Sequence, residues 1–272
     1  MARRELHLKK SKNALDKTPP TIIFFFHVPK TGGETVRKSL MFYGIEQKYR
    51  VIEDISYRFF TEELMSGWHD GTTKLEGNIF IEVHGSINPQ LFIQKLPEWR
   101  TSLAGVGIKV FAFTMLREPL SWYISAFNFL CVQGTSACGD TKHSHQGLVD
   151  SASSNPQCSF FMHGWSIPFL EQDKDHPPVK PNECRIVSQQ LKRNFDWVGT
   201  TENFEETMTV MRNHFPQIGK TIVKNKTKEK VRKHSPVVNS HQIYLENISS
   251  LDKALYLDTQ EYFIFKGGAT KK

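Results

Sequence analysis

A lysine and two glycines between an apolar segment and a helical segment could bind a phosphate group. Residues 29–33 are Pro-Lys-Thr-Gly-Gly, and they follow the strand-like run 22–27. Glycines let the backbone approach an anion, and the free amides at the start of a helix point toward it. Lys30 adds a full positive charge, and the hydroxyls of Thr31 and Thr35 can donate hydrogen bonds. The segment therefore predicts an anion-binding loop.

The order of residues in this loop argues against a nucleotide triphosphatase P-loop. In that motif the lysine and a serine or threonine follow the second of two glycines. Here Lys30 precedes both Gly32 and Gly33. A kinase of the P-loop type would also need Mg²⁺ ligands, for which we find no candidate residues. That class remains an alternative, which magnesium independence would separate from the one favoured below.

Arg117 and Ser125 form a second candidate anion site. The strand-like run 111–116 leads into Arg117, and Pro119 suits the first turn of a helix, because its missing N–H would have no partner there. Ser125 falls on the second turn of that helix, within reach of a ligand held by Arg117. A guanidinium fork and a hydroxyl together suit a phosphate group.

His84 and Glu82 are the candidates for removing a proton from a substrate. The strand-like run 78–84 ends in His84, and ligands of parallel α/β sheets bind at the carboxyl ends of strands. His84 would then share an edge with the two anion loops, where a histidine can take a proton near neutral pH. Glu82 lies on the same side of the strand by its period of two and is the second candidate. A purely structural histidine is the alternative.

The elements that must position these residues are strands that each lead through a loop into a helix. This order predicts an α/β fold: a single domain with a central parallel sheet flanked by helices. The chain has 272 residues, of which 39% are hydrophobic and 23% charged, enough for one substantial core. We expect a flexible basic arm at 1–18, the domain at 19–265 with a divergent, cysteine-containing excursion at 131–183, and a tail at 266–272. The longest apolar run, 22–26, is far too short to span a bilayer.

The motif Pro-Lys-Thr-Gly-Gly-x-Thr, followed later in the chain by Arg117, Pro119 and Ser125, resembles the phosphate loops of sulfotransferases. These enzymes use 3′-phosphoadenosine 5′-phosphosulfate (PAPS), and the similarity is greatest to the Golgi carbohydrate branch. A Val-Gly-x-Thr-Glu segment at 198–202 is similar to relatives of heparan sulfate 2-O-sulfotransferase. The resemblance runs from about residue 21 to residue 265 and is strongest at the two phosphate loops.

The resemblance implies a P-loop-like sulfotransferase fold and transfer of the sulfuryl group of PAPS to a hydroxyl group, without a metal. In that family, the first loop binds the 5′-phosphosulfate, and an Arg-x-Pro motif with a later serine binds the 3′-phosphate. A noncatalytic module that binds PAPS or its desulfated product, PAP, is a further alternative. The matching residues for the 5′-phosphosulfate are Lys30, Thr31, Gly32, Gly33, Glu34 and Thr35, and those for the 3′-phosphate are Arg117 and Ser125.

The resemblance also assigns a lid over the cofactor and shows two departures from the family. The family's Asn/Lys-Lys-Thr/Ser loop corresponds to the segment with Lys226 and Thr227, which we expect to cover the cofactor. Uronic acid 2-O-sulfotransferases have His-Gly-His where this chain has His84, a glycine and Ser86. Glu34 replaces the commoner threonine or serine, although its backbone N–H can still serve and acids are tolerated in a first helical turn.

The charge of the chain favours an anionic partner. The sequence has 35 lysines and arginines against 28 acids, a net charge of +7. Zinc spacings, aromatic RNA-binding signatures and recognition-helix patterns are missing, so nucleic acid is not expected. The basic run 220–233 fits a polyanionic cofactor with an acidic glycan behind it, and a plain solvated face is the alternative. The acceptor that we expect is a hydroxyl-bearing glycan or glycolipid, and a small alcohol is also compatible. We expect the Golgi lumen if an N-terminal anchor has been removed, and the cytoplasm if the chain is full-length.

All four cysteines fall between the second anion motif and the Val-Gly-x-Thr-Glu segment. Their spacing contains no Cys-x-x-Cys pair for zinc, and four cysteines allow three disulfide connectivities. The clustering suggests stapled loops, as in related Golgi enzymes, and free thiols in a cytosolic enzyme are the alternative. The pairs that we expect are Cys131 with Cys138 and Cys158 with Cys184.

Overall fold

The computed structural model describes residues 19–47, 50–53, 55–73, 75, 77–84, 88–127, 129, 155–164, 178–215 and 250–269. Several sequence-based expectations lie outside these residues: the basic arm at 1–18, the lid residues Lys226 and Thr227, Ser86, and the Cys131–Cys138 pair. Among the helices in the described part of the chain, none is both long and apolar enough to cross a membrane.

The core is a parallel five-stranded sheet with the strand order β2-β3-β1-β4-β5. The predicted parallel α/β architecture is thereby confirmed. The central strand, β1, is buried along nearly its whole length, as expected for a strand covered on both faces. The strands are β1 (Thr21–Phe26), β2 (Arg50–Glu53), β3 (Ile79–Val83), β4 (Lys109–Leu116) and β5 (Trp197–Thr200).

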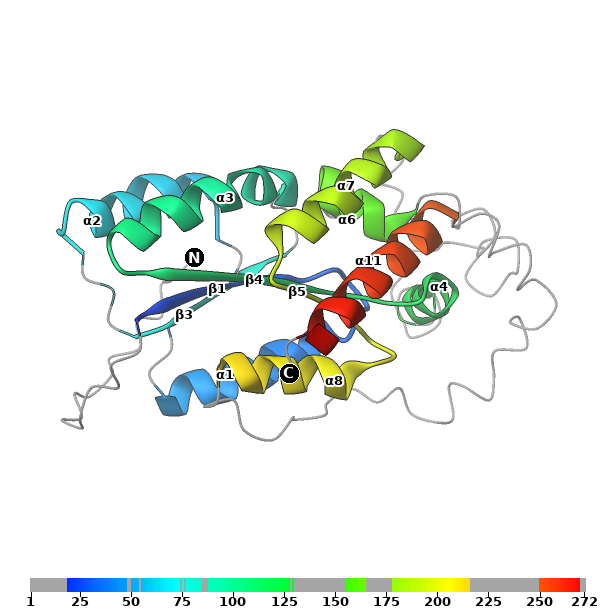
Figure 1. The fold of residues 1–272 in the computed structure, drawn as a ribbon, viewed down its shortest axis with the longest axis horizontal. Helices are drawn as coiled ribbons and strands as arrows, with labels where there is room; N and C mark the ends of the chain where they lie inside the picture. The colour runs from blue at the N-terminus through cyan, green and yellow to red at the C-terminus, as the bar shows by residue number, and fades with distance from the viewer. Residues whose placement is uncertain are drawn as a thin grey trace.

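Helices cover both faces of the sheet. Figure 1 shows α1 and α8 on one face and α3 and α7 on the other. The helix at the C-terminal end runs to Ala269, so it includes the first residues of the segment expected as a tail. The helical elements are α1 (Gly33–Gln47), the π-helix η1 (Phe59–Met65), α2 (Ser66–His69), α3 (Pro89–Gly105), α4 (Pro119–Phe127), α6 (Pro156–His163), α7 (Pro181–Asn194), α8 (Phe204–His214) and α11 (Ser250–Ala269).

The phenylalanines of β1 divide between the two faces of the sheet. Phe24 packs against Trp99 of α3, with ring centroids 5.8 Å apart. Phe25 points to the opposite face, because side chains alternate along a strand, and it stacks on Phe113 at 4.7 Å. His27 follows the same alternation and stacks on Phe25 at 5.2 Å. The side chain of His27, the first residue after β1, therefore lies on the α1 side of the sheet.

Candidate active site

The loop between β1 and α1 has the strand, loop and helix order that its sequence predicts. Lys30 and Gly32 both have positive φ, 65° and 80°. The Thr31 hydroxyl donates a hydrogen bond of 2.8 Å to the Val28 carbonyl, and this bond stabilises the turn. The amide of Thr35 bonds the Gly32 carbonyl at 2.9 Å as the first turn of α1 forms. Hydrogen bonds within the loop thus hold its conformation.

Three consecutive carbonyl groups of this loop accept hydrogen bonds from other parts of the fold. The carbonyl of residue 29 accepts from Trp122 Nε1 at 2.6 Å, and that of residue 30 accepts from Arg117 at 3.1 Å. The carbonyl of residue 31 accepts from the Thr201 hydroxyl at 2.9 Å. Because N–H and C=O of a trans peptide point in opposite directions, the amides of 30–32 face away from these donors. The loop therefore presents a row of amides, which is an arrangement that binds anions.

Lys30 and Arg117 place two cationic side chains at this loop. The ammonium group of Lys30 lies 3.7 Å from the centroid of the exposed Phe129 ring. Burial, and after it the charge of Arg117, lowers the pKa of Lys30 to about 8. Each cation makes the charged form of the other less favourable, so a bound anion would relieve this repulsion.

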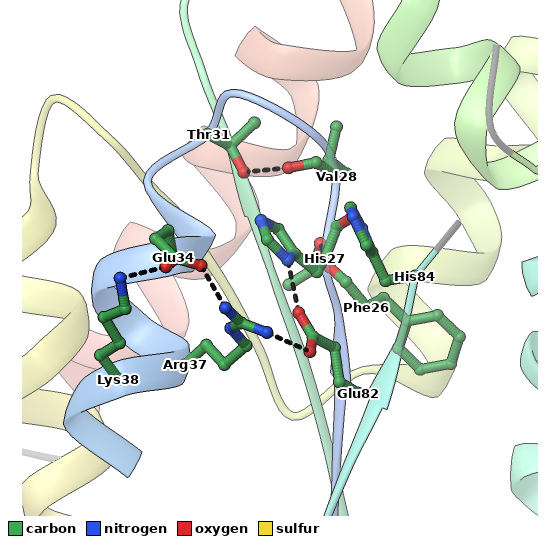
Figure 2. A network of polar contacts seen from close by, with 10 residues as sticks. Phe26, His27, Val28, Thr31, Glu34, Arg37, Lys38, Glu82 and His84 are labelled. Atoms are coloured by element: carbon green, nitrogen blue, oxygen red, sulfur yellow. Dashed lines mark hydrogen bonds and ion pairs between the residues drawn. The ribbon is translucent and has the colours of Figure 1, made fainter. Parts of the chain in front are cut away.

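The carboxylate of Glu34 lies along α1 beside two basic residues. It pairs with Arg37 at 2.7 Å and with Lys38 one position further along the helix. Figure 2 shows both contacts on the flank of the helix. Partial burial would raise the pKa of Glu34, but hydrogen bonds and charge from Lys38 and Arg37 outweigh it and lower the pKa. The negative charge of Glu34 is thus balanced by its two basic neighbours on the same helix.

Arg117 precedes α4, and Ser125 lies within this helix. The carboxylate of Glu118 accepts hydrogen bonds from the amides of Leu120 at 3.0 Å and Ser121 at 2.7 Å. These first amides of α4 are therefore bound within the protein, and the charge offered to a ligand comes from the Arg117 side chain. Ser125 lies on the second turn of α4 and is half-buried.

A buried pair and a stacked histidine lie at the ends of β1 and β3 (Figure 2). Nδ1 of His27 is 2.5 Å from Oε1 of Glu82, and the other carboxylate oxygen, Oε2, lies 3.9 Å from Arg37. Glu82 is 3% exposed. The ring of His84 stacks on His27, with centroids 4.3 Å apart and planes 19° apart. Glu82, the second candidate base, therefore holds His27 with its carboxylate.

The hydrogen bond of His84 defines its tautomer. Its Nδ1 lies 2.9 Å from the main-chain carbonyl oxygen of His27. A carbonyl oxygen can only accept, so Nδ1 carries the hydrogen, and Nε2 of the neutral ring keeps a lone pair. Donor atoms of His27, Glu82 and His84 all lie within 4.8 Å of one another. The two rings are nearly parallel, so their in-plane lone pairs do not converge on one point as metal ligands would.

Three residues of the site were not predicted from the sequence: His27, Trp122 and Thr201. The sequence places His27 at the end of a strand, and its period of two with the apolar Phe25 is a signal for an inward side chain. The indole of Trp122 and the hydroxyl of Thr201 bind main-chain carbonyls, which leave no pattern in the sequence.

One expected disulfide is present. Cys158 of α6 and Cys184 of α7 are bonded, with Cα atoms 5.4 Å apart. Both sulfurs are buried in the core beside α11. The bond therefore joins two helices of the same layer.

Comparison with models of protein families gives a match over most of the chain. The model of a family described as "Sulfotransferase family" matches residues 15–263, which include the loops that follow β1 and β4 and His84. No curated protein matches the chain.

Proposed function

The chain belongs to the sulfotransferase family, and we propose that it transfers the sulfuryl group of PAPS to a hydroxyl group of a carbohydrate. The observation that best supports this donor is the position of two cationic residues, Lys30 and Arg117, in the loops that follow neighbouring strands, where Arg117 bonds the Lys30 carbonyl beside a row of amides. A single cationic side chain could bind one phosphate group. Two cationic groups on separate loops suit a ligand with two anionic ends.

In this proposal, the loop and Arg117 bind the two ends of the donor. The amides of 30–32 and Lys30 hold the 5′-phosphosulfate, while Arg117 and Ser125 hold the 3′-phosphate. PAPS supplies the sulfuryl group and the bisphosphate that leaves. Lys30 neutralises the negative charge that grows on the bridging phosphate oxygen.

His84 is the proposed general base. Its Nδ1–H is held by the carbonyl of His27, so Nε2 can accept the proton of the acceptor hydroxyl. Glu82 is a poorer candidate, because it is buried and its carboxylate is bound to the ring of His27. We therefore assign Glu82 to the positioning of His27, and through the stacked rings to that of His84.

The carbohydrate acceptor rests on the sequence resemblance to the Golgi carbohydrate branch and on the net charge of +7. A glycan and the sugar of a glycolipid both fit this argument. The buried disulfide between Cys158 and Cys184 supports an oxidising compartment, and we propose the Golgi lumen.

The test is transfer of radiolabelled sulfate from PAPS across a panel of glycan, glycolipid and small-alcohol acceptors, with and without EDTA. We expect transfer to at least one carbohydrate, unchanged by the chelator. Binding of PAP without transfer to any acceptor would favour the noncatalytic module. Magnesium-dependent transfer of phosphate from ATP would instead identify a kinase.

A further inference from the structure

Arg117 is bound through its main chain by a side chain from a distant helix. Gln157 of α6 accepts a hydrogen bond from the Arg117 amide at 2.9 Å and donates one to the Arg117 carbonyl at 2.8 Å. Its side chain lies in the interior, because the residue is 1% exposed. One carboxamide therefore satisfies both main-chain polar groups of the residue that follows β4.

From this contact we propose that Gln157 is a positioning residue for the 3′-phosphate site and acts through Arg117. The inference rests on the proposed function, because it takes Arg117 as the ligand of that phosphate. On the β5 side, the amide of Thr201 bonds the Leu116 carbonyl at 2.9 Å. With its backbone held on both sides, Arg117 directs its guanidinium group at the Lys30 carbonyl, 3.1 Å away.

The chemistry of this contact requires glutamine. A carboxamide carries a donor and an acceptor in one plane, so it imitates the peptide group of an adjacent strand. An ionised glutamate has no donor, methionine has neither group, and asparagine is one methylene shorter. The hydrophobic pattern of the sequence around Gln157 does not reveal that a carboxamide is required. This requirement becomes visible in the tertiary structure.

The helix that carries Gln157 is itself anchored at its first turn. The carboxylate of Asp252, from α11, accepts hydrogen bonds from the amides of Gln157 at 3.0 Å and Cys158 at 2.8 Å. Asn155 adds a further hydrogen bond: its side-chain oxygen accepts from the main-chain amide of Asp252 at 3.1 Å. The disulfide to Cys184 fixes the same turn to α7. Contacts with α11 and α7 thus hold the first turn of α6, which carries Gln157.

The experiment compares the affinities for adenosine 3′,5′-bisphosphate and adenosine 5′-monophosphate by calorimetry on the full chain. Gln157→Met should weaken bisphosphate binding by about tenfold and change monophosphate binding little. The matched control is Gln94→Met on the exposed side of α3, which should leave both affinities unchanged. In an Arg117→Ala background, Gln157→Met should have no further effect, because the two residues act as one unit.

Each result decides between the alternatives. Full selectivity for the bisphosphate in Gln157→Met, or a loss that simply adds to that of Arg117→Ala, would overturn the inference but leave the proposed function standing. Failure of the unsubstituted chain to bind the bisphosphate would overturn both.

A measurement on the unsubstituted protein covers the case in which Gln157→Met does not fold. Hydrogen exchange at the Arg117 amide should be slow, because this amide donates to a buried carboxamide. Exchange at the rate of an unprotected amide would contradict the proposed contact. Gln157→Asn, which keeps the polar groups but shortens the reach, should reproduce the loss of selectivity.

Discussion

The guanidinium group of Arg117 donates a hydrogen bond of 3.1 Å to the main-chain carbonyl oxygen of Lys30. This bond joins the loops at the ends of β1 and β4, which are hydrogen-bonded neighbours in the sheet. It also holds a second cationic group close to the Lys30 side chain. The arrangement makes the affinity for anions the first property to test.

Replacing Arg117 by alanine should separate the two phosphates of the donor. A charge-assisted hydrogen bond contributes about 1.5 to 3 kcal/mol, so the affinity for adenosine 3′,5′-bisphosphate should fall by roughly ten- to a hundredfold. The affinity for adenosine 5′-monophosphate should fall much less. Calorimetry measures both, and Arg58→Ala at an exposed position is the control. An equal loss for the two nucleotides would contradict the assignment of Arg117 to the 3′-phosphate.

The pKa of Lys30 predicts a pH dependence of binding. Because this pKa is lowered to about 8, the ammonium form that binds anions is lost as the pH rises above this value. The dissociation constant of the bisphosphate should therefore increase by up to about tenfold between about pH 7 and pH 9. Lys30→Arg, which stays charged, should bind with little change over this range. A flat profile for the unsubstituted chain would show that Lys30 does not contact the anion.

His84→Ala should separate catalysis from binding. Loss of a general base should lower the turnover number by about 10² to 10⁴, while the affinity for the bisphosphate stays nearly unchanged. Glu82→Gln should have a smaller effect, since Glu82 acts through His27. Steady-state kinetics with the best acceptor provide the measurement. If Glu82→Gln abolished turnover and His84→Ala preserved it, the carboxylate would be the base.

Gly33→Ala should destabilise the loop. A Cβ atom at this position would lie 2.1 Å from Nε2 of His27, whose ring is held by Glu82. We expect a loss of about 1 to 3 kcal/mol in the free energy of unfolding, measured by chemical denaturation. Gly105→Ala near the end of α3, where a Cβ would meet no atom within 4 Å, is the control. Equal stability of the two variants would mean that His27 does not occupy this position.

Asp252 should make stability depend on pH. Burial raises its pKa to about 7, against 3.8 for the ordinary carboxyl group. Between these values the folded chain keeps a proton that the unfolded chain releases, so the contribution of Asp252 to stability falls as the pH rises. The stability of the unsubstituted chain relative to Asp252→Asn should fall by up to about 1 kcal/mol per pH unit in this window. A difference that stays constant across this window, in denaturation at a series of pH values, would contradict it.

The sequence by itself determined the parallel α/β fold and the strand, loop and helix order of the segments that carry Lys30 and Arg117. These features are local, because a strand, its loop and the start of its helix lie within one short segment. The apolar run 22–26, the turn at Lys30 and the proline after Arg117 could therefore be interpreted without knowing any distant contact. The carboxyl ends of parallel strands then brought Lys30, His84 and Arg117 to one edge.

The tertiary structure alone decided how these residues are held. The period of two placed Glu82 and His84 on the same side, but the register of β1 against β3, Phe25 with Glu82, brings His27 to the carboxylate. Likewise, Gln157 reaches Arg117 across 40 residues of sequence, through bonds to main-chain atoms. Main-chain N–H and C=O groups are the same in every residue type except proline, so such contacts leave no signature in the sequence and become visible in the packed fold.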